Sequence, residues 1–174
     1  MDIAIWAMVL AIIVSIFAST MFTGASPVPT SASVRDTMLA MLPQRIDGPI
    51  YELGSGWGGL ARVLAGRYPD SPVRGFEISL LPWAVSAVRL KLGGPDNLCF
   101  RYQDFNKADL SGAALVVCYL PGPPMEKLRP KLEAELRPGT LVLSNTFALR
   151  GWQAIDTRTA PDMYRSQVYL YRVE

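Results

Sequence analysis

The sequence of 174 residues contains no histidine. Without an imidazole, a Ser-His-Asp triad and any metal site built on histidine are excluded, and acid–base work near neutral pH must fall to other groups. The sequence has two cysteines, Cys99 and Cys118, which are too few to form a zinc site by themselves. Both fall in apolar, strand-like runs, so we expect reduced, packed thiols and no metal centre.

Charge of either sign is also scarce. The 17 lysines and arginines and 15 acidic residues leave a net charge of +2, which is too small to imply a nucleic-acid partner. No lysine or arginine precedes Arg35, so the amino-terminal end lacks the positive region of a typical secretory signal. Hydrophobic residues make up 50% of the chain, enough for a substantial core.

The amino-terminal part of the chain, by contrast, is strongly apolar. Residues 3–22 contain no charged side chain, and at about 1.5 Å per residue a helix of this length crosses a hydrocarbon core of roughly 30 Å. We therefore predict a membrane anchor over residues 1–22. A cleaved signal peptide and a buried core helix are the alternatives. Because the basic residues follow the run, the positive-inside tendency places the rest of the chain on the cytoplasmic side.

Residues 23–32 are rich in Ser, Thr, Pro and Gly and are predicted to be a linker. The folded domain is then expected over residues 33–174. Ser33 is a suitable N-cap for its first helix, because a serine hydroxyl can accept a hydrogen bond from a backbone N–H of the first turn.

A glycine-rich stretch organises this domain. Residues 50–53 favour a strand, and residues 60–65 have helical spacing. Between them, Gly54, Gly56 and Gly58 permit positive φ and bring bare backbone close to a ligand. A ligand held here would meet the unpaired N–H groups of a helix N-terminus.

Two cofactor classes use such a turn. Gly54, Gly56 and Gly59 fit the dinucleotide pattern G-x-G-x-x-G, so NAD must be considered. Glu52 argues against it, because a carboxylate beside the turn repels an anionic pyrophosphate and attracts a cationic ligand. A strand, turn and helix without any ligand is the third interpretation.

The rest of the pattern alternates strands and helices and ends in a hairpin. This order predicts a doubly wound α/β sheet, mostly parallel, with a carboxy-terminal antiparallel hairpin. Glu77 ends the second expected strand about twenty residues beyond the glycine turn, where such folds place a carboxylate for ribose hydroxyls. The expected strands are 50–53, 73–77, 98–102, 113–120 and 141–147, followed by two extended stretches between 152 and 173; the main expected helices begin at 33, 60, 79 and 125.

The form E-x-G-x-G-x-G resembles the first motif of class I S-adenosylmethionine (SAM) methyltransferases. The resemblance covers about residues 33–174 and implies a seven-stranded Rossmann-like methyltransferase sheet with SAM as cofactor. It also implies that an acid after the third strand, Asp104, faces the adenine amino group; a helix cap is the alternative role. The cofactor-binding residues that follow from this resemblance are Glu52, Leu53, Gly54, Ser55, Gly56, Gly58, Glu77, Ile78, Asp104 and Phe105.

A narrower resemblance rests on the anchor, the minimal core, residues 75–78 and residues 119–121. These features look like the small membrane-associated lysine methyltransferases related to the mitochondrial enzyme that acts on the ATP synthase c subunit. The resemblance implies a membrane-proximal acceptor, most simply a protein lysine. We expect Tyr119 to orient that acceptor and Pro121 to shape the adjoining loop, with ordinary packing and a plain turn as alternatives. An NAD-dependent oxidoreductase and a noncatalytic SAM-binding membrane protein are the alternative functions.

Overall fold

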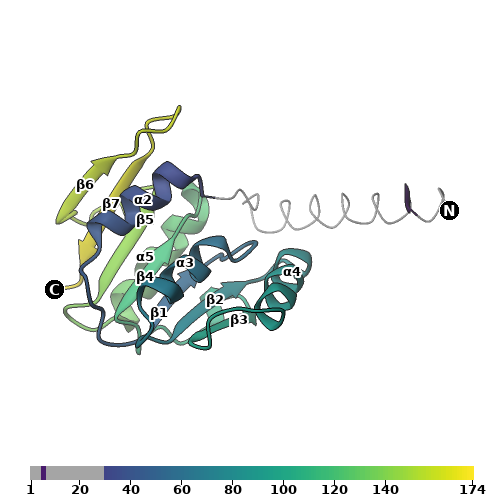
Figure 1. Ribbon diagram of the computed structural model, residues 1–174. Helices are drawn as coiled ribbons and strands as arrows, with labels where there is room; N and C mark the ends of the chain where they lie inside the picture. The colour runs from purple at the N-terminus through teal and green to yellow at the C-terminus, as the bar shows by residue number, and fades with distance from the viewer. Residues whose placement is uncertain (1–4, 7–29) are drawn as a thin grey trace.

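The computed structural model describes residues 5, 6 and 30–174 (Figure 1). Most of the predicted anchor over 1–22 and of the linker therefore lies outside the described residues. Within the described ranges, no helix has the length and apolarity needed to cross a bilayer. The first described helix, α2 (Ala32–Met41), is capped by Ser31, whose hydroxyl accepts from Val34 N. The cap predicted at Ser33 is wrong, because Ser33 already lies inside this helix.

The domain is built on one sheet of seven strands in the order β3-β2-β1-β4-β5-β7-β6. The first five strands run parallel, and β7 pairs antiparallel with both β5 and β6. The predicted sheet and its terminal hairpin are thereby confirmed. The strands are β1 (Ile50–Leu53), β2 (Val73–Glu77), β3 (Leu98–Tyr102), β4 (Leu115–Cys118), β5 (Leu141–Asn145), β6 (Asp156–Thr159) and β7 (Gln167–Arg172).

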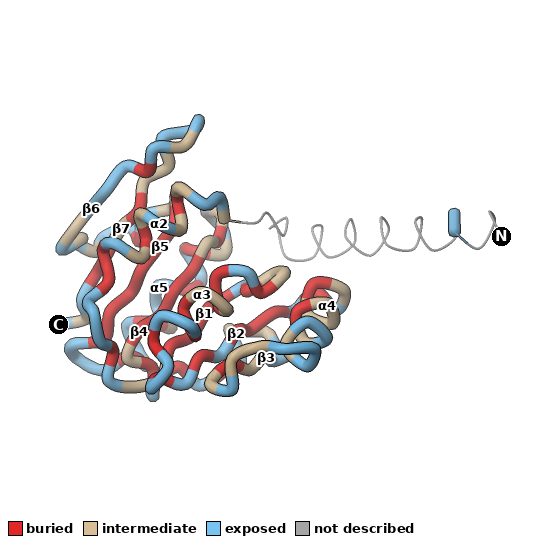
Figure 2. The backbone as a smooth tube through the Cα atoms, viewed as in Figure 1, coloured by how far each residue is buried: buried red, intermediate tan, exposed pale blue. Residues whose placement is uncertain are grey.

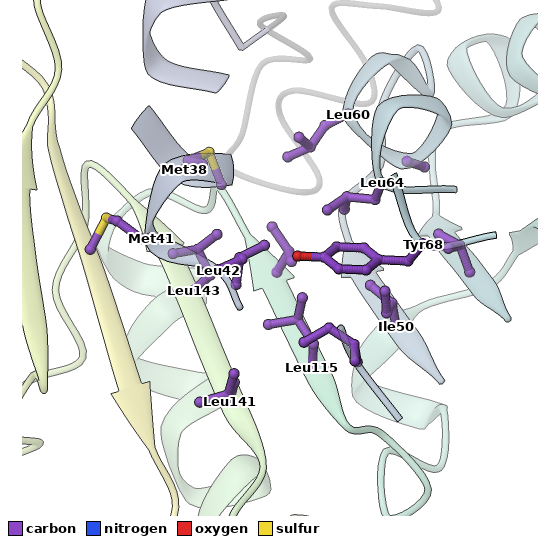
Figure 3. Packing of buried hydrophobic residues seen from close by; sticks show 14 of the residues in the cluster. Met38, Met41, Leu42, Ile50, Leu60, Leu64, Tyr68, Leu115, Leu141 and Leu143 are labelled. Carbon is purple, nitrogen blue, oxygen red and sulfur yellow. The ribbon is translucent and has the colours of Figure 1, made fainter. Parts of the chain in front are cut away.

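Helices cover both faces of this sheet. Buried side chains of α2 and α3 (Gly59–Arg67) form one core with alternate strand residues (Figure 3). Trp83 of α4 (Leu80–Lys91) packs against this core. The other strand residues pack against α5 (Gly122–Glu135) on the opposite face. Figure 2 shows that the burial is concentrated in the strands between these layers. A parallel strand covered on both faces must be apolar throughout, as the uniformly buried β4 is.

The connection from β3 to β4 replaces a full crossover helix with one short 3₁₀ turn, η1 (Phe105–Lys107). Strands β3 and β4, which carry Cys99 and Cys118, are separated in the sheet by β2 and β1. Both cysteines are free thiols, as predicted.

Helix α5 begins three residues before the predicted position 125 and continues through Pro130. The early start has a physical reason, because proline is tolerated in a first helical turn whose N–H groups need no partner.

Candidate functional site

The site begins where β1 ends, at the carboxyl edge of the parallel strands. Gly54, Gly56 and Gly58 have φ values of 73°, 51° and 76°, so all three use the left-handed backbone that the sequence predicted. The N–H groups of Gly54 and Ser55 both donate to the carbonyl of Phe76 at 2.9 Å. The loop is therefore fastened to β2, and its next residues lead directly into the N-terminus of α3.

One glycine in this loop is required by packing. A Cβ built on Gly58 would lie 2.5 Å from the ring of Phe100 and 2.9 Å from Cβ of Ser86. At Gly59, the third glycine of the dinucleotide pattern, a Cβ would meet nothing within 4 Å. In a dinucleotide site that third glycine serves close helix–strand packing. Gly59 has no such role here, which removes the main structural support for the NAD interpretation.

Glu52 is buried beneath the loop, and its side chain is incompletely paired. Its Oε2 has no hydrogen-bond partner within the described part of the chain, and the same holds for Oγ of the buried Ser55. Burial raises the pKa of Glu52 to about 8, an effect that a backbone hydrogen bond from Ala61 partly opposes and nearby Glu77 reinforces. A buried carboxylate oxygen without a partner is costly unless a ligand completes it. The position therefore suits a cationic group.

Glu77 reaches the same loop from the end of β2. Its Oε2 accepts from Gly56 N and its Oε1 accepts from Ser79 N, both at 2.7 Å. Two backbone donors hold the carboxylate at the loop while each oxygen keeps further lone pairs for a ligand. Ile78 follows it and is 45% exposed, so an apolar side chain borders the site. Leu53, by contrast, is fully buried in the core, which leaves only its backbone to face a cofactor.

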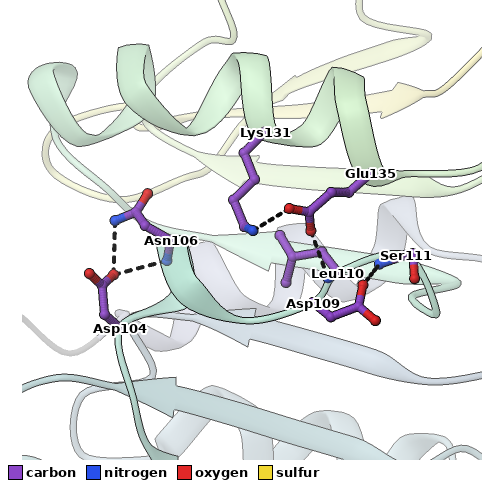
Figure 4. Close-up of polar contacts among 7 residues, drawn as sticks. All are labelled: Asp104, Asn106, Asp109, Leu110, Ser111, Lys131 and Glu135. Carbon is purple, nitrogen blue, oxygen red and sulfur yellow. Dashed lines mark hydrogen bonds and ion pairs between the residues drawn. The ribbon is translucent and has the colours of Figure 1, made fainter.

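Asp104 performs the capping role that was the alternative to adenine binding. Its Oδ1 accepts from both Asn106 N and Asn106 Nδ2 at 2.9 Å (Figure 4). An adenine contact by Asp104 stays a prediction, and it would use the other carboxylate oxygen. Phe105 is half-buried against the core under α5. Farther along, Glu135 of α5 accepts from Leu110 N at 2.8 Å, which fastens this connection to the helix.

The ends of β4 and β5 contribute an aromatic pair. Tyr119 and Phe147 are stacked, with ring centroids 6.2 Å apart and an interplanar angle of 24°. Tyr119 directly follows β4, and Pro121 is the N-cap of α5. Both predicted acceptor-side residues thus lie at the same sheet edge as the glycine loop. Phe147, on which Tyr119 stacks, is half-buried. We call these two rings the Tyr119–Phe147 pair.

Sequence reasoning missed how this pair is held. Thr146 has a φ of 66°, and Phe147 N donates to the carbonyl of Asn145 at 2.7 Å, which closes a tight three-residue turn of the positive-φ type. A β-branched residue in this conformation is strained. Thr146 N donates to Gln167 O, also at 2.7 Å, and Ser144 Oγ donates to Phe147 O. Such a strained conformation is retained where several surrounding contacts fix the backbone, and it is common at functional sites.

The solved structures that are similar to this fold include two methyltransferases. An RNA methyltransferase from Salinibacter ruber, crystallised with S-adenosylhomocysteine, has a TM-score of 0.75 and 32% identity, covering 84% of this chain and 94% of that one. A precorrin-6y C5,15-methyltransferase from Geobacter metallireducens has a TM-score of 0.68 at 15% identity, covering 86% of this chain and 92% of that one, and shows the fold alone. With the glycine loop and the two buried carboxylates, the similarity to the Salinibacter enzyme defines a class I SAM-dependent methyltransferase.

The family follows from sequence comparison. Residues 52–156 match the ANTKMT methyltransferase domain. A protein-lysine N-methyltransferase of Saccharolobus islandicus is 32% identical over 147 residues, which cover 83% of this chain and 91% of the relative. The adenine nucleotide translocase lysine N-methyltransferase of Mus musculus is 31% identical over 131 residues, or 74% of this chain and 56% of the relative. The chain belongs to the ANTKMT methyltransferase domain family, and the predicted relationship to small lysine methyltransferases is confirmed.

The described residues fit SAM as the cofactor. SAM carries a sulfonium and an ammonium, and the unpaired, buried Oε2 of Glu52 can pair with one of these cations once the carboxyl ionises. The bare loop beside it leaves room for the rest of the molecule. The described part of the chain contains no group of three or more metal-ligating side chains.

Proposed function

We propose that this protein is a membrane-anchored protein-lysine N-methyltransferase, with SAM over the glycine loop and its methyl group directed at the Tyr119–Phe147 pair. The observation that carries the proposal is the buried Glu52 carboxyl, which has an unpaired oxygen and stands two residues before the first glycine of a left-handed loop. The lysine acceptor is supported by the two protein-lysine methyltransferases to which the chain is similar.

SAM supplies an activated methyl group. The lone pair of the acceptor amine forms the new N–CH₃ bond while the S–CH₃ bond breaks and its electrons remain on sulfur. The protein has to align three atoms, and orientation alone is worth several kcal/mol. Glu77 is suited to fix the ribose, and the loop N–H groups to hold the amino-acid end. No acid is needed for the leaving sulfide, so a chain without histidine is adequate.

The acceptor lysine must be neutral before it reacts. An apolar surface disfavours the ammonium form and lowers its pKa, so the proton is lost to water as the side chain enters. The Tyr119–Phe147 pair is suited to provide such a surface at the mouth of the site, and Pro121 to set the course of the loop beside it. In this proposal, Tyr119 is the catalytic residue that contacts the acceptor.

The anchor belongs to the same proposal. Residues 1–22 hold the protein in the membrane, 23–32 link it, and 33–174 form the methyltransferase domain on the cytoplasmic side. The uncharged run at 3–22 supports this arrangement, as does the absence of basic residues before Arg35. A short linker keeps the site near the bilayer and raises the effective concentration of a membrane-embedded acceptor.

The test is transfer of a tritiated methyl group from SAM into isolated membranes by the full-length protein. We expect label that is sensitive to protease and that appears as methyl-lysine after acid hydrolysis. Gly56→Val serves as the inactive control, because it forces a β-branched residue into a loop position with a φ of 51°. Label removed by ribonuclease would instead assign an RNA acceptor, in line with the name of the Salinibacter relative.

A second comparison separates the anchor from the chemistry. Deleting residues 1–30 retains the N-cap Ser31 and every proposed cofactor residue, so SAM affinity should be unchanged. Transfer to a membrane-embedded acceptor should fall, because tethering no longer concentrates the enzyme. Full-length protein that stays in the supernatant after sedimentation of membranes would refute the anchor and leave the methyltransferase assignment standing.

A further inference from the structure

The turn of the β6–β7 hairpin lies at the same sheet edge as the cofactor site. Strand β7 starts beside the end of β5, where Asn145 pairs with Val168 and Thr146 N donates to Gln167 O. Residues 160–166, which join β6 to β7, therefore stand beyond the carboxyl ends of the parallel strands. This is the edge from which an acceptor must approach.

This turn is ordered and carries two large exposed side chains. Asp162 accepts from both Ser166 N and Ser166 Oγ at 2.7 Å, and Arg165 N donates to the carbonyl of Asp162 at 3.1 Å. Within this clamp, Met163 is 89% exposed and Tyr164 is 84% exposed. A turn fixed by its own hydrogen bonds holds these side chains outward instead of letting them fold back onto the domain. We call residues 163–165 the hairpin tip.

The chain enters the domain on the same side. Ala40 near the end of α2 accepts from Arg158 Nη1, one residue before the end of β6. Met38 of α2 packs in one core with Leu60 at the start of α3 (Figure 3). Ala160, at the start of the turn, belongs to the same core. In Figure 1, α2 crosses the end of the sheet formed by β5, β7 and β6, which carries the hairpin. The apolar run at 3–22 is joined to this side by residues 23–29, which span at most roughly 25 Å.

We infer that the hairpin tip is a second membrane contact, which turns the active-site edge toward the bilayer. The inference rests on the anchor of the proposed function. Tyr and Arg suit the membrane–water interface because each combines an apolar body with a polar end, and Met adds apolar surface. A short linker limits how far this edge can lie from the bilayer, so the tip and the anchor engage one surface. The partner that the hairpin tip contacts is therefore the bilayer.

The test uses the full-length protein in vesicles of phosphatidylcholine and phosphatidylglycerol. A nitrobenzoxadiazole dye is attached to Met163→Cys in a Cys99→Ser background, and Cys118 stays because it is buried. The matched control is Leu92→Cys. Leu92 is 83% exposed at the end of α4, which leads back to the amino end of β3 and hence to the opposite edge. Nitroxide-labelled lipid quenches dye that lies at the membrane.

We expect the residue-163 dye to shift to the blue and to lose most of its emission to nitroxide lipid, and the residue-92 dye to change little. Equal, weak quenching of both dyes on vesicle-bound protein would overturn the hairpin contact and leave the anchor intact. Protein that does not sediment with vesicles would overturn both. A residue-163 dye that responds only when acceptor protein is added would reassign the tip to protein docking and contradict the inference.

Discussion

The affinity of the protein for SAM should depend on pH through Glu52. Burial raises the pKa of this carboxyl to about 8 in the ligand-free protein. A cationic ligand pairs with the ionised form, so below that pH binding must first remove a proton. Between pH 6 and pH 7 the ionised fraction rises about tenfold, and the association constants of SAM and S-adenosylhomocysteine should rise by the same factor. Above pH 8 they should level off.

Calorimetric titration with S-adenosylhomocysteine at pH 6, 7 and 8 measures this dependence. Glu52→Gln is the matched control, since it keeps the shape of the side chain and removes its ionisation; its affinity should be lower at pH 8 and nearly flat between pH 6 and pH 7. Titration in two buffers with different ionisation enthalpies should show proton release by the wild type at pH 6. An equal slope in wild type and variant would refute the pairing of Glu52 with the ligand cation.

Three other predictions test separate parts of the site. Glu77→Ala should weaken S-adenosylhomocysteine binding by about 5- to 150-fold, because it removes a partner worth roughly 1–3 kcal/mol; an unchanged dissociation constant in calorimetry would exclude the ribose role. Gly58→Ala should lower the free energy of unfolding by about 1–2 kcal/mol from backbone strain alone, and Gly59→Ala, where a Cβ has open space, should be nearly neutral in urea denaturation. Phe147→Ala should lower kcat/KM for the acceptor about 2- to 10-fold through loss of the contact with Tyr119, with cofactor affinity unchanged; a weaker affinity would place Phe147 in the cofactor site.

The parts of the fold that sequence reasoning predicted are those fixed by local chemistry. Glycines at 54, 56 and 58 predict left-handed backbone, because few other residues adopt positive φ readily. An acid at 77 predicts a carboxylate at the end of the strand, because few other side chains can accept hydrogen bonds there in the same way. The apolar run of β4 likewise predicts a strand covered on both faces. The terminal hairpin followed from two extended stretches around a turn.

What sequence reasoning missed depends on contacts between distant segments. Thr146 has poor intrinsic preference for positive φ, and its turn exists because β7 and Ser144 hold the backbone on either side. The first helix is capped by Ser31 and not by Ser33, because two nearby serines offer the same hydroxyl and local sequence does not choose between them. Met163 and Tyr164 are exposed because the register of β6 and β7 places them in the turn of the hairpin. Their hydrophobicity alone would have placed them in the core.

The central claim is that SAM lies over the glycine loop and presents its methyl group to the Tyr119–Phe147 pair. A crystal structure of the full-length protein with S-adenosylhomocysteine tests it most directly. We predict that the ribose hydroxyls donate to Glu77, that the ligand ammonium lies within hydrogen-bond reach of Glu52, and that the sulfur faces Tyr119. A ligand whose ribose lies away from Glu77, or whose sulfur faces a surface other than the aromatic pair, would contradict the account.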